Sequence, residues 1–315
     1  MRFKIPCKTY RGSTITGLVL VLLLLLTPAA VLANSARDTD RALFWSIQKN
    51  GQPAGYLLGT IHSEDPRVLD FSESFLGKLK TNQVFAMELV PNLSTLAQLT
   101  DYMHLPQAQS LESVIGSGRF AALSSALSAY KVPAEFVSRM KPWAAMMTLS
   151  TPPPVTGFFM DLSLSLRASG SGLKVVGLET LEQQLSFLED MPMAMQLSLL
   201  DQAIAEFDQV TEAHDLMVDA YLKNDLFELQ ALSDEHLEDV GEEVSHYFVD
   251  SGINARNLRM AESLLSHLES NRVFVAVGAL HLRGEEGLIN LLRRQGYELT
   301  PLGLPFSEVT PIQEQ

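Results

Sequence analysis

Two short segments of the chain share the pattern Gly-x-x-His, and each follows an apolar run. Residues 58–62 read Leu-Gly-Thr-Ile-His and residues 277–281 read Val-Gly-Ala-Leu-His, so the histidines are His62 and His281. One such match is weak, because a single histidine is more often a hydrogen-bonded structural residue. The pair favours metal chemistry, since neutral imidazole together with carboxylate is an ordinary ligand set for zinc, manganese or cobalt.

Two glutamates occupy similar places. Glu88 lies near the end of the apolar run 84–89, and Glu179 directly follows the apolar run 174–178. A carboxylate in such a context needs a cation, a metal or a strong hydrogen-bond donor, because burying it alone is costly. The alternatives are a strand-end Glu88 that faces water, and a Glu179 that belongs to a first helical turn, where the helix dipole favours an acid.

Arg256 stands at the start of an apolar-periodic helix. Near a site, its guanidinium could bind a substrate carboxylate or stabilise an oxyanion; the alternative is a surface salt bridge. Asp161 also has two interpretations: it belongs to the site, or it is only a helix N-cap. The other histidines lie among polar helical residues and are expected at the surface: His104, His214, His236, His246 and His267.

The elements that must position these residues follow from the apolar patterning. The apolar runs predict six strands, and the pattern between them is helical. The dipeptide Asn50-Gly51, which lies between the first two predicted strands, predicts a hairpin. We expect an α/β fold in which a mixed central sheet is flanked by helices, with a helical insertion at about residues 181–270. The predicted strands are residues 42–47, 55–59, 84–89, 174–178, 273–277 and 297–300.

The candidate residues His62, Glu88, Glu179 and His281 all fall at or just beyond the ends of predicted strands. In open α/β sheets, ligands bind at the carboxyl ends of the strands. The glycine of each Gly-x-x-His motif would let the strand turn sharply and approach a ligand closely. The sequence therefore predicts one site at this edge of the sheet.

Residues 1–33 have the pattern of a secretory signal peptide. Four basic residues precede an apolar run at 18–26, and small residues near 31–33 suggest cleavage before Asn34. The apolar run is short for a membrane span, so we expect export to a bacterial periplasm or beyond, without a stable membrane anchor; the alternative is an uncleaved anchor. The only cysteine lies in this leader, which excludes a disulfide scaffold for the rest.

The predicted mature chain, residues 34–315, is strongly acidic. The leader holds four of the 23 basic residues and none of the 37 acidic ones, which leaves a formal net charge of −18. Such a charge argues against nucleic acid or anionic lipid as partner and is compatible with a cation site. We expect a peptide or small-molecule substrate.

These motifs together resemble the TraB/PrgY/GumN family, to which the TIKI proteins also belong. The resemblance covers roughly residues 42–300 and rests on their order and spacing. It is carried by residues 44–47, 56–62 and 85–89, by Gly177-Leu-Glu-Thr, by Arg256-Asn257, and by residues 277–282. The second motif has Leu280 where many relatives have glycine, which leaves His281 in place.

The resemblance implies a metal-dependent protease supported by manganese or cobalt, with zinc not excluded, and a fold related to erythromycin-esterase-like and ChaN-like proteins. The leading hypothesis is an exported metal-dependent hydrolase, most simply a peptidase. In it His62 and His281 bind the metal, and Glu88 is a third ligand or general base. Glu179 is a further acid, and Arg256 orients substrate or stabilises negative charge. The competing hypothesis is a non-catalytic periplasmic protein that sequesters a peptide signal or a metal-bearing ligand.

Overall fold

The computed structural model describes residues 40–306, with the side chains of residues 236–240 left aside. The predicted signal peptide lies outside this range. Among the described residues, no helix has the length and apolar character needed to cross a membrane.

A six-stranded mixed sheet forms the centre of the molecule, and each of its strands overlaps a predicted one. Strands β2, β3, β4 and β5 run parallel, whereas β1 is antiparallel to both of its neighbours, β2 and β6. The order across the sheet is β4-β3-β5-β2-β1-β6. The strands are β1 (Phe44–Lys49), β2 (Gln52–Thr60), β3 (Val84–Met87), β4 (Lys174–Gly177), β5 (Val273–Gly278) and β6 (Glu298–Leu302).

The hairpin between β1 and β2 turns at the predicted dipeptide. Asn50 and Gly51 have φ values of 53° and 72°. Positive φ at both central residues is the geometry of the turn that matches the twist of paired strands, which is why Asn-Gly is favoured there.

The central strand β5 explains why its sequence is an unbroken apolar run. Residues 273–277 are all buried, as expected for a parallel strand that is covered on both faces. Phe274 packs against Phe44, Phe75 and Phe85 with ring centroids 5.5 to 6.0 Å apart. This aromatic cluster fixes β5 between its neighbours.

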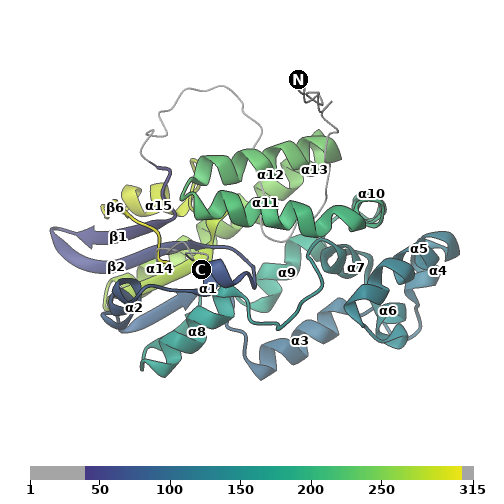
Figure 1. Cartoon of the computed structure of the whole chain (residues 1–315), viewed down its shortest axis with the longest axis horizontal. Helices are drawn as coiled ribbons and strands as arrows, with labels where there is room; N and C mark the ends of the chain where they lie inside the picture. The colour runs from purple at the N-terminus through teal and green to yellow at the C-terminus, as the bar shows by residue number, and fades with distance from the viewer. Residues whose placement is uncertain (1–39, 307–315) are drawn as a thin grey trace, which may run out of the picture.

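Helices fill the connections between the strands, and α4–α7 gather at the end of the molecule away from β1 and β2 (Figure 1). The first helices, before β3, are α1 (Pro66–Leu69) and α2 (Glu73–Lys80). Between β3 and β4 lie α3 (Leu93–Met103), α4 (Leu111–Ile115), α5 (Ser117–Leu127), η1 (Ser128–Tyr130), α6 (Ala134–Arg139), α7 (Pro142–Leu149) and α8 (Met160–Gly170).

The predicted helical stretch at 181–270 is helical in the structure, and α10 packs against α7 of the earlier stretch. It comprises α9 (Leu181–Glu189), α10 (Met193–Ala205), η2 (Phe207–Gln209), α11 (Val210–Leu222), α12 (Leu226–Val240), α13 (Glu242–Tyr247), the π-helix η3 (Phe248–Asn254) and α14 (Ala255–Leu268). After β5 come η4 (Ala279–His281) and α15 (Leu288–Arg294). The sequence predicts helices between the strands in general, but it places an insertion only at this second stretch, whereas the stretch between β3 and β4 is also long and helical.

Candidate functional site

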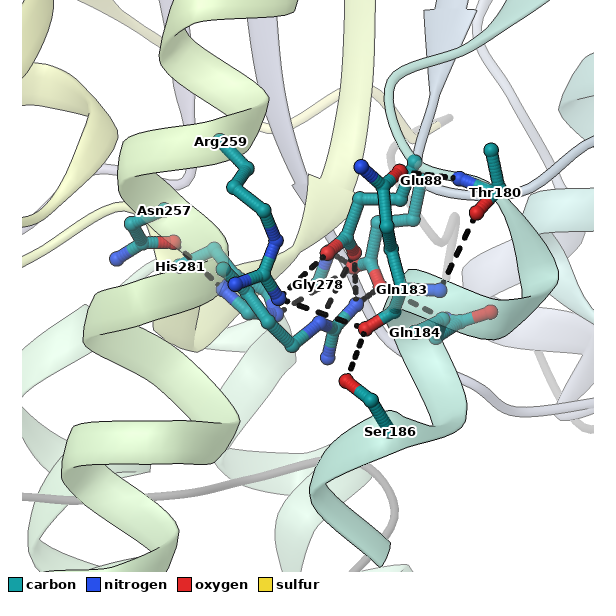
Figure 2. Close-up of polar contacts among 11 residues, drawn as sticks. Glu88, Thr180, Gln183, Gln184, Ser186, Asn257, Arg259, Gly278 and His281 are labelled. Carbon is teal, nitrogen blue, oxygen red and sulfur yellow. Dashed lines mark hydrogen bonds and ion pairs between the residues drawn. The ribbon is translucent and has the colours of Figure 1, made fainter. Parts of the chain in front are cut away.

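The four parallel strands end at one edge of the sheet, as predicted. Thr60 of β2 pairs with Gly278 of β5, and Met87 of β3 pairs with Ala276 of β5 and Gly177 of β4. The next residues along each strand include the two histidines and the two glutamates. The structure brings three of these four side chains together with Arg256, and we call Glu88, Glu179, Arg256 and His281 the rim cluster. Figure 2 shows Glu88 and His281 of this cluster with Gly278, Gln184 and Asn257 beside them.

Glu88 is the centre of the rim cluster. Its Oε1 accepts a hydrogen bond from the backbone N–H of Gly278 (2.8 Å) and lies 3.7 Å from Nε2 of His281. Its Oε2 accepts from Nη2 of Arg256 (2.6 Å) and from Nε2 of Gln184 (3.2 Å). Burial alone would raise the pKa of Glu88, but Arg256, His281 and the Gly278 N–H together lower it to about 2. Glu88 is therefore ionised at neutral pH and does not simply face water.

Arg256 links the two glutamates. Its Nε and Nη2 donate to Oε2 of Glu179 at 2.9 and 2.7 Å, while Nη2 also reaches Glu88. The Glu179 side chain is completely buried, and burial raises its pKa even though Arg256 opposes that shift. Glu179 precedes the N-cap Thr180 of α9 and is not a first-turn acid. Arg256 itself is buried, so the surface salt bridge considered for it is wrong.

His281 is held from its other side by Asn257. The motif glycine ends β5, η4 follows, and this turn buries the imidazole. Nδ1 of His281 lies 2.7 Å from Oδ1 of the fully buried Asn257, so Nδ1 is the donor. Burial lowers the pKa of His281 to about 4, so the ring is neutral near pH 7. Its Nε2 then presents a lone pair towards Glu88.

His62 lies apart from the rim cluster in its contacts. Its ring stacks on Phe159 (centroids 3.9 Å apart), and its Nδ1 is 3.6 Å from Oδ2 of Asp161. The other carboxylate oxygen of Asp161 accepts from the Thr60 hydroxyl at 2.6 Å. Asp161 is thus not the N-cap of α8, a position that Phe159 occupies. Each motif histidine therefore has an oxygen atom beside its Nδ1.

Several residues in and around the site differ from what the sequence predicts. Gln184 lies in the first turn of α9, four residues after the N-cap Thr180, and its Nε2 donates to Glu88. The ring of His214 contacts the backbone of His62, and only 14% of its side chain is exposed, so its expected surface position is wrong. His104 is also only partly exposed, with Nε2 buried. No sequence signal marked Phe159.

The motif glycines are needed for close packing, in part as predicted. A Cβ at Gly59 would lie 2.9 Å from Cα of Ala279 and 2.8 Å from Leu282, so η4 is pressed against β2 there. A Cβ at Gly278 would lie 3.2 Å from Oε1 of Glu88. Both positions have ordinary strand-like backbones without positive φ. The glycines therefore make room for neighbours and do not form sharp turns.

The donor set fits a divalent metal in part. Within residues 40–306, no group of three or more His, Cys, Asp and Glu side chains is placed to hold a metal ion. Glu88 Oε1 and His281 Nε2, however, are two acceptors that face each other at 3.7 Å. Two ligands at about 2.1 Å from one tetrahedral ion lie about 3.4 Å apart. In metal-binding histidines, the ring nitrogen that does not bind the metal typically faces an oxygen atom. Both motif histidines have such an oxygen beside Nδ1.

The chain belongs to the TraB/PrgY/gumN family, whose sequence profile matches residues 43–301.

Curated relatives of the chain are named metalloproteases. It is 24% identical to Metalloprotease TIKI2 of Xenopus tropicalis over 339 residues, which cover 89% of this chain and 64% of the relative. It is also 24% identical to Metalloprotease TIKI1 of Danio rerio over 337 residues, covering 89% and 67%. The chain thus spans about two thirds of the length of these relatives. No solved structure matches the chain, so the expected relation to esterase-like folds stays a prediction.

Proposed function

We propose that the protein is a metal-dependent hydrolase that cleaves peptides. The observation that carries the proposal is the pair of part-buried Glu88 and buried, neutral His281, whose acceptor atoms face each other at 3.7 Å. Two acceptors repel each other unless a cation lies between them. The names of the TIKI relatives support peptide hydrolysis as the reaction.

In this proposal Glu88 and His281 hold the metal, and His62 supplies a further imidazole from the neighbouring strand. A bound divalent ion would lower the pKa of a water molecule and polarise the peptide carbonyl. Asn257 keeps the proton of His281 on Nδ1, and Asp161 favours the same tautomer for His62. Both Nε2 atoms are then left as acceptors. The same reasoning fits manganese, cobalt or zinc.

The pKa of Glu88 and the burial of Glu179 indicate different roles for the two glutamates. A carboxylate with a pKa of about 2 is a poor proton acceptor near pH 7, so Glu88 suits a ligand better than a general base. Glu179 has no exposed side-chain surface and suits the task of holding Arg256. Arg256 is engaged with both glutamates, which supports a positioning role over direct contact with substrate.

The test is hydrolysis of a peptide library by the purified protein with added Mn²⁺ or Co²⁺. We expect cleavage that a chelator stops and that His281→Ala and His62→Ala each abolish. His246→Ala is the matched control, since that histidine is 53% exposed and lies on α13. Cleavage that survives chelation and both substitutions contradicts the proposal, and so does stoichiometric peptide binding without any product.

We also propose that the protein is exported. The support is the pattern of residues 1–33, with its basic start, apolar run and small residues. In a bacterial host, the protein recovered from the periplasm should begin at Asn34 on N-terminal sequencing. Recovery of the unprocessed chain in the cytoplasm contradicts this.

A further inference from the structure

The segment that joins α7 to α8 is anchored to a glutamate two residues beyond His62. Oε2 of Glu64 accepts from the backbone N–H groups of Thr156 (2.6 Å) and Gly157 (3.1 Å), and from the Thr156 hydroxyl. Its Oε1 accepts from the backbone N–H of Val155 (3.2 Å). One carboxylate thus binds three consecutive backbone amides.

The same segment is tied a second time at its far end. The backbone N–H of Met160 donates to the carbonyl of Ser63 at 3.1 Å. Within the segment, the Phe158 N–H donates to the Thr156 hydroxyl at 3.0 Å, which shapes a local turn. Residues 155–160 are therefore fastened on both sides to residues 63 and 64, which directly follow His62.

Between the two anchors lies the residue that covers His62. The rings of Phe159 and His62 stack at 3.9 Å with an interplanar angle of 16°. Asp161, two residues further on, has its carboxylate 3.6 Å from Nδ1 of His62. Because Phe159 belongs to this anchored stretch and Asp161 directly follows it in α8, the position of the stretch determines the plane of the His62 ring.

We propose that Glu64 is a positioning residue, which fixes the orientation of His62 by holding residues 155–157 and hence Phe159. The effect of Glu64 on catalysis rests on the proposed function, whereas the effect of Glu64 on the orientation of the His62 ring does not. Glu64 reaches the segment by hydrogen bonds alone, so removing the acceptor oxygens releases three amides together.

The test reads the His62 ring directly by NMR of the metal-free protein, with the signal assigned by its loss in His62→Gln. Stacking on Phe159 shifts the His62 ring protons upfield, and Phe159→Leu gives their position without that ring. We expect Glu64→Ala to move them to the Phe159→Leu position, and Glu64→Gln, which retains one acceptor, to move them part of the way. Glu73→Gln, an exposed acid on α2, and Phe158→Leu, the exposed neighbour, should leave them unchanged.

The kinetic arm separates this inference from the proposed function. We expect Glu64→Ala to lower kcat of metal-dependent peptide cleavage about tenfold with a smaller change in KM, because a misplaced catalytic group costs rate. His62 signals that stay at their wild-type position in Glu64→Ala, or in Glu64→Gln where the alanine variant does not fold, overturn the inference. If the wild-type protein cleaves no peptide, the proposed function fails and the NMR arm still decides the role of Glu64.

Discussion

Arg256 is the cation that balances the two carboxylates of the rim cluster. It supplies the guanidinium for both Glu88 and Glu179 from a buried position. A buried charge that loses its partner is far more destabilising than an exposed one, because water cannot replace the lost interaction. The cluster therefore ties stability to the geometry of the proposed site.

We expect Arg256→Met to lower the free energy of unfolding at pH 7 by about 3–5 kcal/mol, the range typical of breaking a buried ion pair. Arg294→Met is the matched control, since Arg294 is 48% exposed in its pairs with Glu285 and Glu286. That change should cost less than about 1 kcal/mol. Urea unfolding measures both, and equal losses in the two variants contradict a buried cluster.

The residues of the rim cluster could be predicted from sequence, but their contacts could not. Glu88, Glu179 and His281 stand at strand ends, and the parallel topology alone places them on one edge. Arg256 reaches them only because α14 begins directly after the π-helix η3 and faces that edge. The orientation of His62 depends on Phe159 and Asp161, which lie about a hundred residues away, and no periodicity encodes that contact.

At the level of elements, β2 and η4 are in contact because Gly59 has no side chain. The turn that carries His281 lies against the strand that leads to His62. Any atom added at Gly59 must move the backbone of η4, because the contact at 2.9 Å is to a Cα atom. The spacing of the two histidine-bearing segments is therefore set at this glycine.

We expect Gly59→Ala to destabilise the protein by about 1–3 kcal/mol, as overpacking does, and to lower Mn²⁺ affinity by displacing His281. Gly77→Ala is the control, since Gly77 lies in α2 with open space around its Cα. That change should stabilise the protein by about 0.5–1 kcal/mol through helix propensity. Thermal unfolding and metal titration measure the two effects. A Gly59→Ala protein with wild-type stability and affinity contradicts the close contact.

Strands β1 to β5 were predictable because each contains a short apolar run, whereas the helices between β3 and β4 left a weaker signal. Helix α3 carries apolar residues at helical spacing, but none of its residues is buried, and Leu93 and Leu96 are exposed. Helices α4 and α6 are only five and six residues long. Such helices are stabilised by packing against other elements, and their own sequence carries little of that information.

Across the whole molecule, the rim cluster joins parts of the chain that are distant in sequence. Glu88 bonds to Gly278 and Arg256 across separations of 190 and 168 residues. It connects the ends of β3 and β5 with α14 and, through Glu179, with the start of α9. Protonation within the cluster therefore acts on global unfolding and not on one local element.

The metal-free protein should lose stability in acid in two steps. The pKa of His281 falls from 6.5 to about 4 on folding, so between these values only the unfolded chain binds the proton, and stability falls as pH falls. Glu88, lowered from 4.5 to about 2, adds a second loss over that lower range. His281→Gln should remove its own share of the first step, at most about 3 kcal/mol, and leave the share of His214, whose pKa burial also lowers. His246→Gln should retain the whole step. Urea unfolding from pH 7 to 4 measures this, and an unchanged slope in His281→Gln contradicts a buried neutral His281.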